Sequence, residues 1–99
     1  MIKLIMNEFC CYGKPTIRAK KPMDISVEYT GGAYILKFPD TYPELKDDWA
    51  SDSTLGYAIV DLENWIHFVW EDYVECDEKE LAPASILFRN RLKEIFERD

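Results

Sequence analysis

The sequence predicts a small α+β domain in which an antiparallel sheet packs on one long central helix and a second helix follows near the C-terminus. Apolar and polar residues alternate before Gly31-Gly32 and strand-forming residues follow these glycines, which is typical of a β-hairpin. Apolar residues spaced by three and four over residues 55–74 are typical of a helix with one buried face. A length of 99 residues fits a single domain over residues 1–99.

The N-terminal segment is expected to contribute strands to this sheet. Residues 2–9 alternate, with Ile2, Leu4 and Met6 on one side, which predicts a first strand. Residues 16–20 can form a short second strand, which we expect Lys20-Lys21-Pro22 to end because proline lacks a backbone N–H. Whether the first strand joins the sheet of the hairpin stays open at this point.

The hairpin is the clearest local pattern. Ile25, Val27 and Tyr29 alternate with polar residues and are expected to share one sheet face. Residues 33–38 form the returning strand, which Pro39 ends. Gly31-Gly32 supplies the positive φ angles that a tight hairpin turn requires.

The second half of the chain predicts a loop and two helices. Residues 39–53 contain turn formers and five acids, so we expect a long loop. The central helix should run from Leu55 to Val74, capped by Asp52, Ser53 or Thr54. After an acidic connector, Pro83 suits the first turn of a helix that could extend to about Glu97.

The net charge of −7 is unevenly distributed. Residues 1–38 carry six cations and three anions, whereas residues 39–83 carry two cations and thirteen anions. A negative field repels phosphate backbones, so direct nucleic-acid binding is disfavoured and a basic protein partner is favoured. The basic residues Lys14, Arg18, Lys20 and Lys21 could contact nucleic acid or, in a homo-oligomer, the acidic half of a second copy.

Composition also bounds the location and the cofactors. The apolar stretches are too short for a membrane span, and the N-terminal run is too short for a secretory signal. Cys10, Cys11 and Cys76 form an odd set without disulfide spacing, which favours the cytoplasm. The sequence has no C-x-x-C zinc motif and no glycine-rich phosphate loop, so we expect no metal and no cofactor.

Candidate catalytic groups are sparse. His67 lies four residues from both Glu63 and Glu71, which predicts a charge cluster on a solvated helix face or, less favoured, a proton carrier tuned by carboxylates. No nucleophile lies at a spacing that enlists His67 as a base. Cys10-Cys11 is better explained as buried thiols than as a reactive pair. We therefore expect a protein without catalytic activity.

Residues 25–85 resemble a HicB-like antitoxin domain. The resemblance rests on the hairpin followed by Phe38-Pro39-Asp40, on Asp52-Ser53-Thr54-Leu55, on Asn64-Trp65 and on Leu81-Ala82-Pro83. The chain departs from that family in its Tyr42-Pro43-Glu44-Leu45 segment and longer acidic loop, where the family has a compact turn and a third strand. The resemblance implies a sheet packed on the long helix and a role in masking a small basic RNA-cleaving toxin.

These observations predict a contact surface formed by the acidic loop and the outer side of the central helix. Large aromatic side chains are frequent anchors at interfaces. Three functions fit: an antitoxin-like inhibitor, a phage or mobile-element inhibitor that mimics nucleic acid, or a homo-oligomeric structural module. The predicted contact residues are Asp40, Glu44, Asp47, Asp48, Trp49, Asp52, Trp65, Phe68, Trp70 and Glu71.

Overall fold

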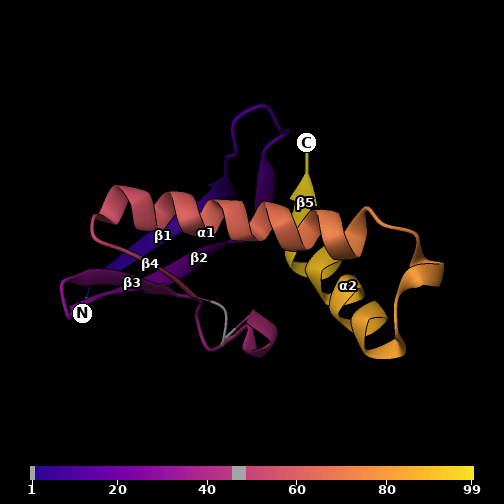
Figure 1. Ribbon diagram of the computed structural model, residues 1–99. Helices are drawn as coiled ribbons and strands as arrows, with labels where there is room; N and C mark the ends of the chain where they lie inside the picture. Colours follow the sequence, from indigo (N-terminus) through magenta and orange to yellow (C-terminus); the bar gives the residue numbers. More distant parts are fainter. Residues whose placement is uncertain (1, 46–48) are drawn as a thin grey trace.

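The structure is a computed structural model that describes residues 2–45 and 49–99, with only the backbone for residues 49 and 50. It confirms the predicted α+β fold, with an antiparallel sheet, a long helix and a second C-terminal helix (Figure 1). The elements in chain order are β1 (Ile2–Phe9), β2 (Ile17–Thr30), β3 (Ala33–Lys37), η1 (Pro43–Leu45), β4 (Trp49–Asp52), α1 (Leu55–Val69), η2 (Trp70–Val74), η3 (Glu78–Glu80), α2 (Pro83–Ile95) and β5 (Phe96–Arg98).

The sheet is organised around β2. Its order is β1-β2-β3-β4, and β5 pairs with the first part of β2. The N-terminal strand therefore joins the sheet of the hairpin, with Ile2 opposite Val27 and Phe9 opposite Ile17. β1 and β5 both pair with Ile17 and Arg18 of β2, so β2 lies between the N-terminal and the C-terminal strand at this point.

The Gly-Gly hairpin is present as predicted. β2 and β3 pair from Ser26–Lys37 to Thr30–Ala33, and the turn between them contains Gly31 at φ 59° and Gly32 at φ 80°. Both angles lie in the left-handed region that side chains disfavour, which explains the two glycines. The rings of Tyr29 and Tyr34, directly opposite each other, pack at an interplanar angle of 53° next to the turn, with their centroids 4.8 Å apart.

The expected strand end at Lys20-Lys21-Pro22 is wrong, because β2 continues through it. Residues 20–22 have no ladder partner among the described strands, and the β1–β2 register shifts between Met6 and Glu8 at this level. Since no neighbouring strand needs an N–H from Pro22, its missing donor costs little. Pro22 therefore lies inside β2, in a short unpaired stretch where the register between β1 and β2 shifts.

The predicted loop over residues 39–53 contains two elements that the sequence did not indicate. The 3-10 turn η1 places Leu45 in the core, with no exposed surface. The strand β4 pairs antiparallel with β3, with Asp52 opposite Tyr34 and Ser51 opposite Ile35. At four residues, β4 is too short to produce a visible alternation.

The central helix has the predicted extent. α1 begins after Thr54, whose Oγ1 accepts a hydrogen bond of 3.2 Å from the N–H of Tyr57. Its last turn continues into η2, a π-helical turn in which the N–H of Glu75 donates to the carbonyl of Trp70 at 3.2 Å. The two elements together span residues 55–74.

The second helix begins as predicted but ends two residues before Glu97. α2 stops at Ile95, and residues 96–98 form β5 beside β2. Phe96 is consequently turned into the core, where its ring meets the ring of Phe9 edge to face at 5.8 Å. The edge-to-face pair fixes the chain end against β1 and β2.

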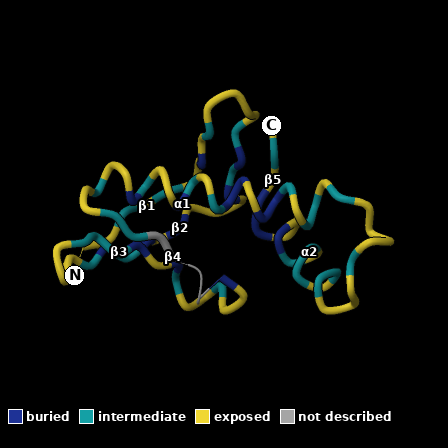
Figure 2. Tube along the Cα trace, in the orientation of Figure 1, coloured by how far each residue is buried: buried dark blue, intermediate teal, exposed yellow. Residues whose placement is uncertain are grey.

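The hydrophobic core lies between α1 and the sheet and extends beneath α2 (Figure 2). The inward side of β2 supplies Ile17, Met23, Ile25 and Val27, and α1 supplies the facing side chains. Along β1 and β3 the opposite sheet face carries exposed residues such as Ile5 and Lys37. The members contributed by the helices and by β5 are Ala58, Leu62, Ile66, Val69, Trp70, Leu92, Ile95 and Phe96.

We predict that Thr54→Ala lowers the free energy of unfolding by about 1 kcal/mol, because the first turn of α1 loses its side-chain cap. Urea denaturation followed by circular dichroism measures the change. Thr54→Ser keeps the accepting oxygen and should cost much less. Equal losses in both variants would show that the cap does not stabilise the helix.

Candidate functional site

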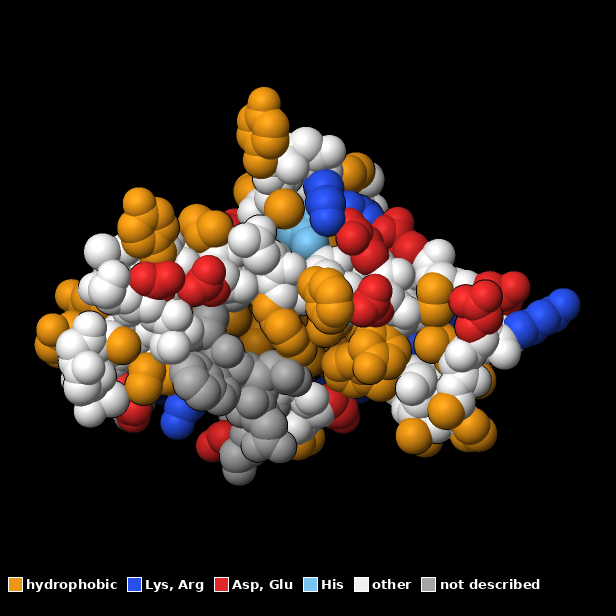
Figure 3. Space-filling model, in the orientation of Figure 1, with side chains coloured by type: hydrophobic (Ala, Val, Ile, Leu, Met, Phe, Trp, Pro, Cys, Tyr) orange, Lys and Arg blue, Asp and Glu red, His pale blue; other side chains and the backbone are white. Residues whose placement is uncertain are grey.

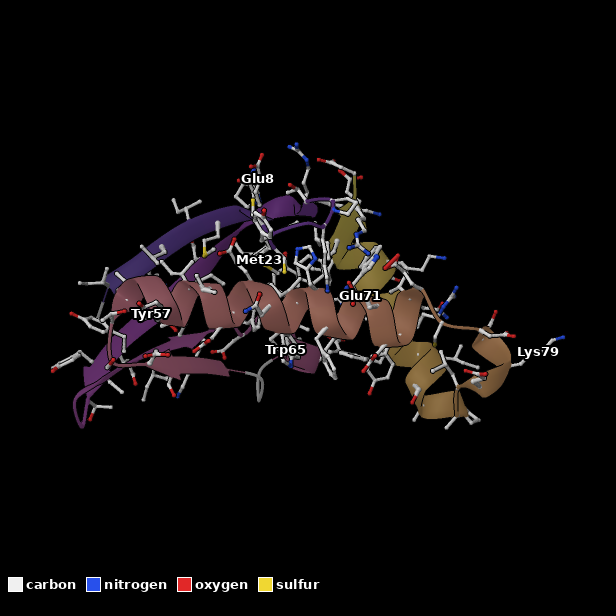
Figure 4. All side chains as sticks on the ribbon, turned by 45° about the horizontal axis from the view of Figure 1, so that its top comes forward. Glu8, Met23, Tyr57, Trp65, Glu71 and Lys79 are labelled. Carbon is white, nitrogen blue, oxygen red and sulfur yellow. The ribbon has the colours of Figure 1, made fainter. Side chains whose placement is uncertain are left out.

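The predicted contact residues lie on two different sides of α1. Figure 4 shows Trp65 on one side of the helix and Glu71 on the other. The Trp65 side borders β3 and the segment after it, because the Trp65 ring packs on Phe38 at 5.6 Å. The Glu71 side borders the β1–β2 loop through Lys14. The sequence placed these residues on one surface, and the structure divides them.

Phe68 is an exposed aromatic residue of α1, with 60% of its surface accessible. Trp65 is half-buried and adjoins it three residues earlier on α1. Figure 3 shows hydrophobic side chains gathered below α1 in the middle of this view, with acidic side chains to either side. We call the surface formed by Asp52, Asp61, Trp65, Phe68 and Asp72 the aromatic–acidic face.

The carboxyl groups of Asp52 and Asp61 lie close together at one end of this face. Partial burial raises the pKa of Asp61, and the charge of Asp52 and a hydrogen bond to it raise it further. Asp52 also accepts a hydrogen bond of 2.7 Å from the N–H of Ser53. Two neighbouring carboxylates repel each other, so this end of the face favours an approaching cation.

Trp70 does not belong to this surface. Only 8% of its area is exposed, and it lies in the core where η2 begins. Tyr73, also in η2, packs edge to face on Phe88 of α2, with the ring centroids 4.9 Å apart. The aromatic residues of this helix thus divide between the core and the surface.

Asp40 lies between β3 and η1, and Glu44 lies within η1. Asp40 is exposed and borders a hollow of about 460 Å³ with Lys3, Asp24 and Ser26. Glu44 pairs with Arg91 of α2 at 3.1 Å. A hydrogen bond from its own backbone N–H lowers the pKa of Glu44, and Arg91 lowers it further. Glu44 is therefore already neutralised within the molecule.

Glu71 is neutralised in the same way on the opposite side of α1. Its Oε1 lies 2.7 Å from Lys14 Nζ and 3.6 Å from Arg98 Nη2. The hydrogen bond from Lys14 is the main reason that the pKa of Glu71 is lowered. Arg98 also pairs with Glu75. These ion pairs connect the β1–β2 loop, the end of the helix and β5.

Three predicted residues cannot be placed on either side. Asp47 and Asp48 lie outside the described residues, and so does the side chain of Trp49.

His67 contradicts the prediction of a solvated charge cluster. It has no exposed surface, and its Nε2 lies 2.8 Å from the carbonyl oxygen of Phe9. A carbonyl only accepts, so Nε2 carries the proton and donates it. The N–H of Cys10 donates to Glu63 Oε2 at 2.6 Å beside it. His67 therefore attaches the end of β1 to α1, through a partner 58 residues away that no local spacing indicates.

The cysteines are reduced and differ from the expectation of buried thiols. Cys10 is exposed, whereas Cys11 and Cys76 are half-buried. Cys11 Sγ donates to Asn64 Oδ1 at 3.4 Å, which adds a contact between the β1–β2 loop and α1.

Within the part of the chain that the structure describes, no group of three His, Cys, Asp or Glu side chains is arranged to hold a metal ion. A second hollow, of about 410 Å³, is lined by Lys20, Lys21, Tyr42 and Arg91 among others. In the same described part, no helix is long and apolar enough to cross a membrane.

Comparisons with models of protein families, with curated proteins and with solved structures give no match for this chain.

His67→Phe should lower the free energy of unfolding by about 1–3 kcal/mol, because the buried carbonyl of Phe9 loses its donor. Urea denaturation of the purified variant measures it. His67→Gln retains an N–H donor and should lose less. A phenylalanine variant as stable as the native protein would contradict the role of His67 in joining β1 to α1.

Glu71 should make the stability depend on pH in the acidic range. Because its pKa is lower in the folded than in the unfolded chain, its contribution is present above the unfolded pKa and is lost as the pH falls through the folded pKa. Glu71→Gln should therefore reduce the loss of stability measured between about pH 5 and pH 3. Glu78→Gln, at an exposed position on η3, is the control and should leave the native pH dependence unchanged.

Proposed function

We propose that this protein acts by binding a basic protein partner through the aromatic–acidic face, without catalysis of its own. The observation that carries the proposal is Phe68, which is 60% exposed beside Trp65 and lies on the same helix as Asp61. An exposed large ring next to a half-buried ring offers an apolar anchor, and the adjacent carboxylates offer charge recognition.

The distribution of ion pairs supports this side of α1 over the other. Glu44, Glu71 and Glu75 each pair with an arginine or lysine of the same chain. Within the described residues, no ion pair engages Asp61 or Asp72. The free negative charge of the helix is therefore concentrated around Phe68, where a partner's lysine or arginine would meet it.

The carboxyl pair of Asp52 and Asp61 supports the same choice. Partial burial and mutual repulsion disfavour the charged form of Asp61 in the isolated protein. A cation from the partner would relieve this repulsion on binding. Relief of the repulsion between Asp52 and Asp61 would then contribute to the binding free energy. Among the described residues of the free protein, no cation pairs with either carboxylate.

We propose further that the partner is a small basic RNA-cleaving protein, as the resemblance of residues 25–85 to HicB-like antitoxins implies. The odd set of cysteines without disulfide spacing favours the cytoplasm as the place where the two meet. Masking such a partner requires a complementary surface and neither a metal nor a cofactor. A nucleic-acid mimic would need many free carboxylates, and the pairing of Glu44, Glu71 and Glu75 within the chain disfavours that alternative.

Co-expression with small basic proteins encoded beside its gene, followed by affinity capture, tests the proposal. The native chain should retain one of them and suppress its RNA cleavage. Phe68→Ala and Asp61→Lys should each weaken binding at least about tenfold, since truncated interface anchors commonly cost more than 1 kcal/mol. Added salt should weaken the native complex.

Matched variants outside the face serve as controls. Leu87→Ala removes a side chain of α2 that is 72% exposed, and Glu78→Lys makes the same charge reversal on η3. Both should bind as the native chain does. Equal weakening by control and face variants, or no capture of any such protein, would contradict the proposal. Competition by duplex DNA for the captured protein would favour the nucleic-acid mimic.

A further inference from the structure

The strand β1 forms an open edge of the sheet. It pairs with β2 and, among the described strands, with no other. In an antiparallel ladder, alternate residues of an edge strand direct their N–H and C=O groups away from the sheet. These groups are available for pairing along β1 before Phe9, whose carbonyl accepts from His67, whereas β4 at the other edge has only four residues.

This edge has few of the features that usually protect a strand from pairing, since the register shift with β2 falls near its end, between Met6 and Glu8. β1 contains no proline, and its charged residues are Lys3 and Glu8. Ile5 is 76% exposed and Ile2 is 67% exposed, which are large values for isoleucine. A long exposed edge with apolar side chains is a template for another strand.

The sequence of β1 is complementary to itself in the antiparallel direction. With a twofold axis at Ile5, the two Ile5 side chains meet on the open face of the sheet, and Leu4 lies opposite Met6 on the helix-facing side. Lys3 then lies opposite Asn7, and Ile2 lies opposite Glu8, whose carboxylate already pairs with Arg18 of its own chain at 2.9 Å. No like charges face each other across this pairing.

We propose that β1 is the interface of a twofold-symmetric dimer of this chain, in which the two sheets form one continuous antiparallel sheet. Leu4 and Met6, now half-buried at the margin of the core, would be covered by the second copy. A twofold axis perpendicular to the sheet keeps both α1 helices on the same face.

The dimer leaves the aromatic–acidic face free. Trp65 points toward Phe38, which follows β3, whereas β1 lies on the other side of β2. Each copy would therefore present its own contact surface at the outer part of the joined sheet. The inference concerns β1 alone and does not depend on the identity of the partner.

Sedimentation equilibrium of the native chain tests the dimer and should give a mass near twice 11.7 kDa. Ile5→Lys places two cations against each other at the axis and should give a monomer whose thermal unfolding stays cooperative. Leu87→Lys introduces the same charge at an equally exposed position of α2 and should remain dimeric. A native chain that is monomeric at all concentrations would overturn the proposal.

A cross-link tests the register independently of the lysine variant. In a chain whose Cys10, Cys11 and Cys76 are replaced by serine, Ile5→Cys should form a disulfide-linked dimer on mild oxidation, and Leu87→Cys should not. A dimer that persists in Ile5→Lys, or that cross-links equally through both positions, would place the interface elsewhere, including at the basic hollow of Lys20 and Lys21. Such a result would also overturn the proposal.

Discussion

The packing of α1 against the inward side of β2 is the interaction on which the rest of the structure depends. Ala58, Leu62 and Ile66 recur along one stripe of the helix and face a row of β2 side chains that includes Ile25 and Val27. Burying these apolar surfaces is the main favourable contribution to folding in a chain of this size. β1, β3 and β5 pair with β2. α2 packs against the C-terminal end of the central helix, where Tyr73 of η2 contacts Phe88.

This arrangement determines which surfaces remain for binding. α1 covers one face of the sheet, and exposed residues such as Asn64 and Phe68 lie on its two sides. On one side the β1–β2 loop is held by His67, Asn64 and Glu71, and the charges there are satisfied within the chain. On the other side Phe68 is exposed, and among the described residues no ion pair engages Asp61. The binding surface that we propose is thus the side that intramolecular contacts left open.

Much of the fold could be predicted from local pattern, because the hairpin glycines and the three-and-four spacing of α1 act over short distances. The predictions that were wrong concern features that depend on residues far apart in the sequence. β4 exists through its pairing with β3, and β2 passes Pro22 because no strand pairs there. His67 is buried because the end of β1 offers it a carbonyl 58 residues away. Whether Glu44 and Glu71 are neutralised depends on Arg91 and Lys14, whose contacts no spacing indicates.

Amide hydrogen exchange of the native chain, resolved by residue, tests the central position of the α1–β2 packing most directly. If the rest of the structure depends on it, the amides of Leu62 and Ile66 in α1 and of Ile25 and Val27 in β2 should be the slowest to exchange. They should share one opening free energy, equal to that of global unfolding. Exchange of α1 at a distinctly lower free energy than β2 would contradict the account, because the helix would then open while the sheet persists.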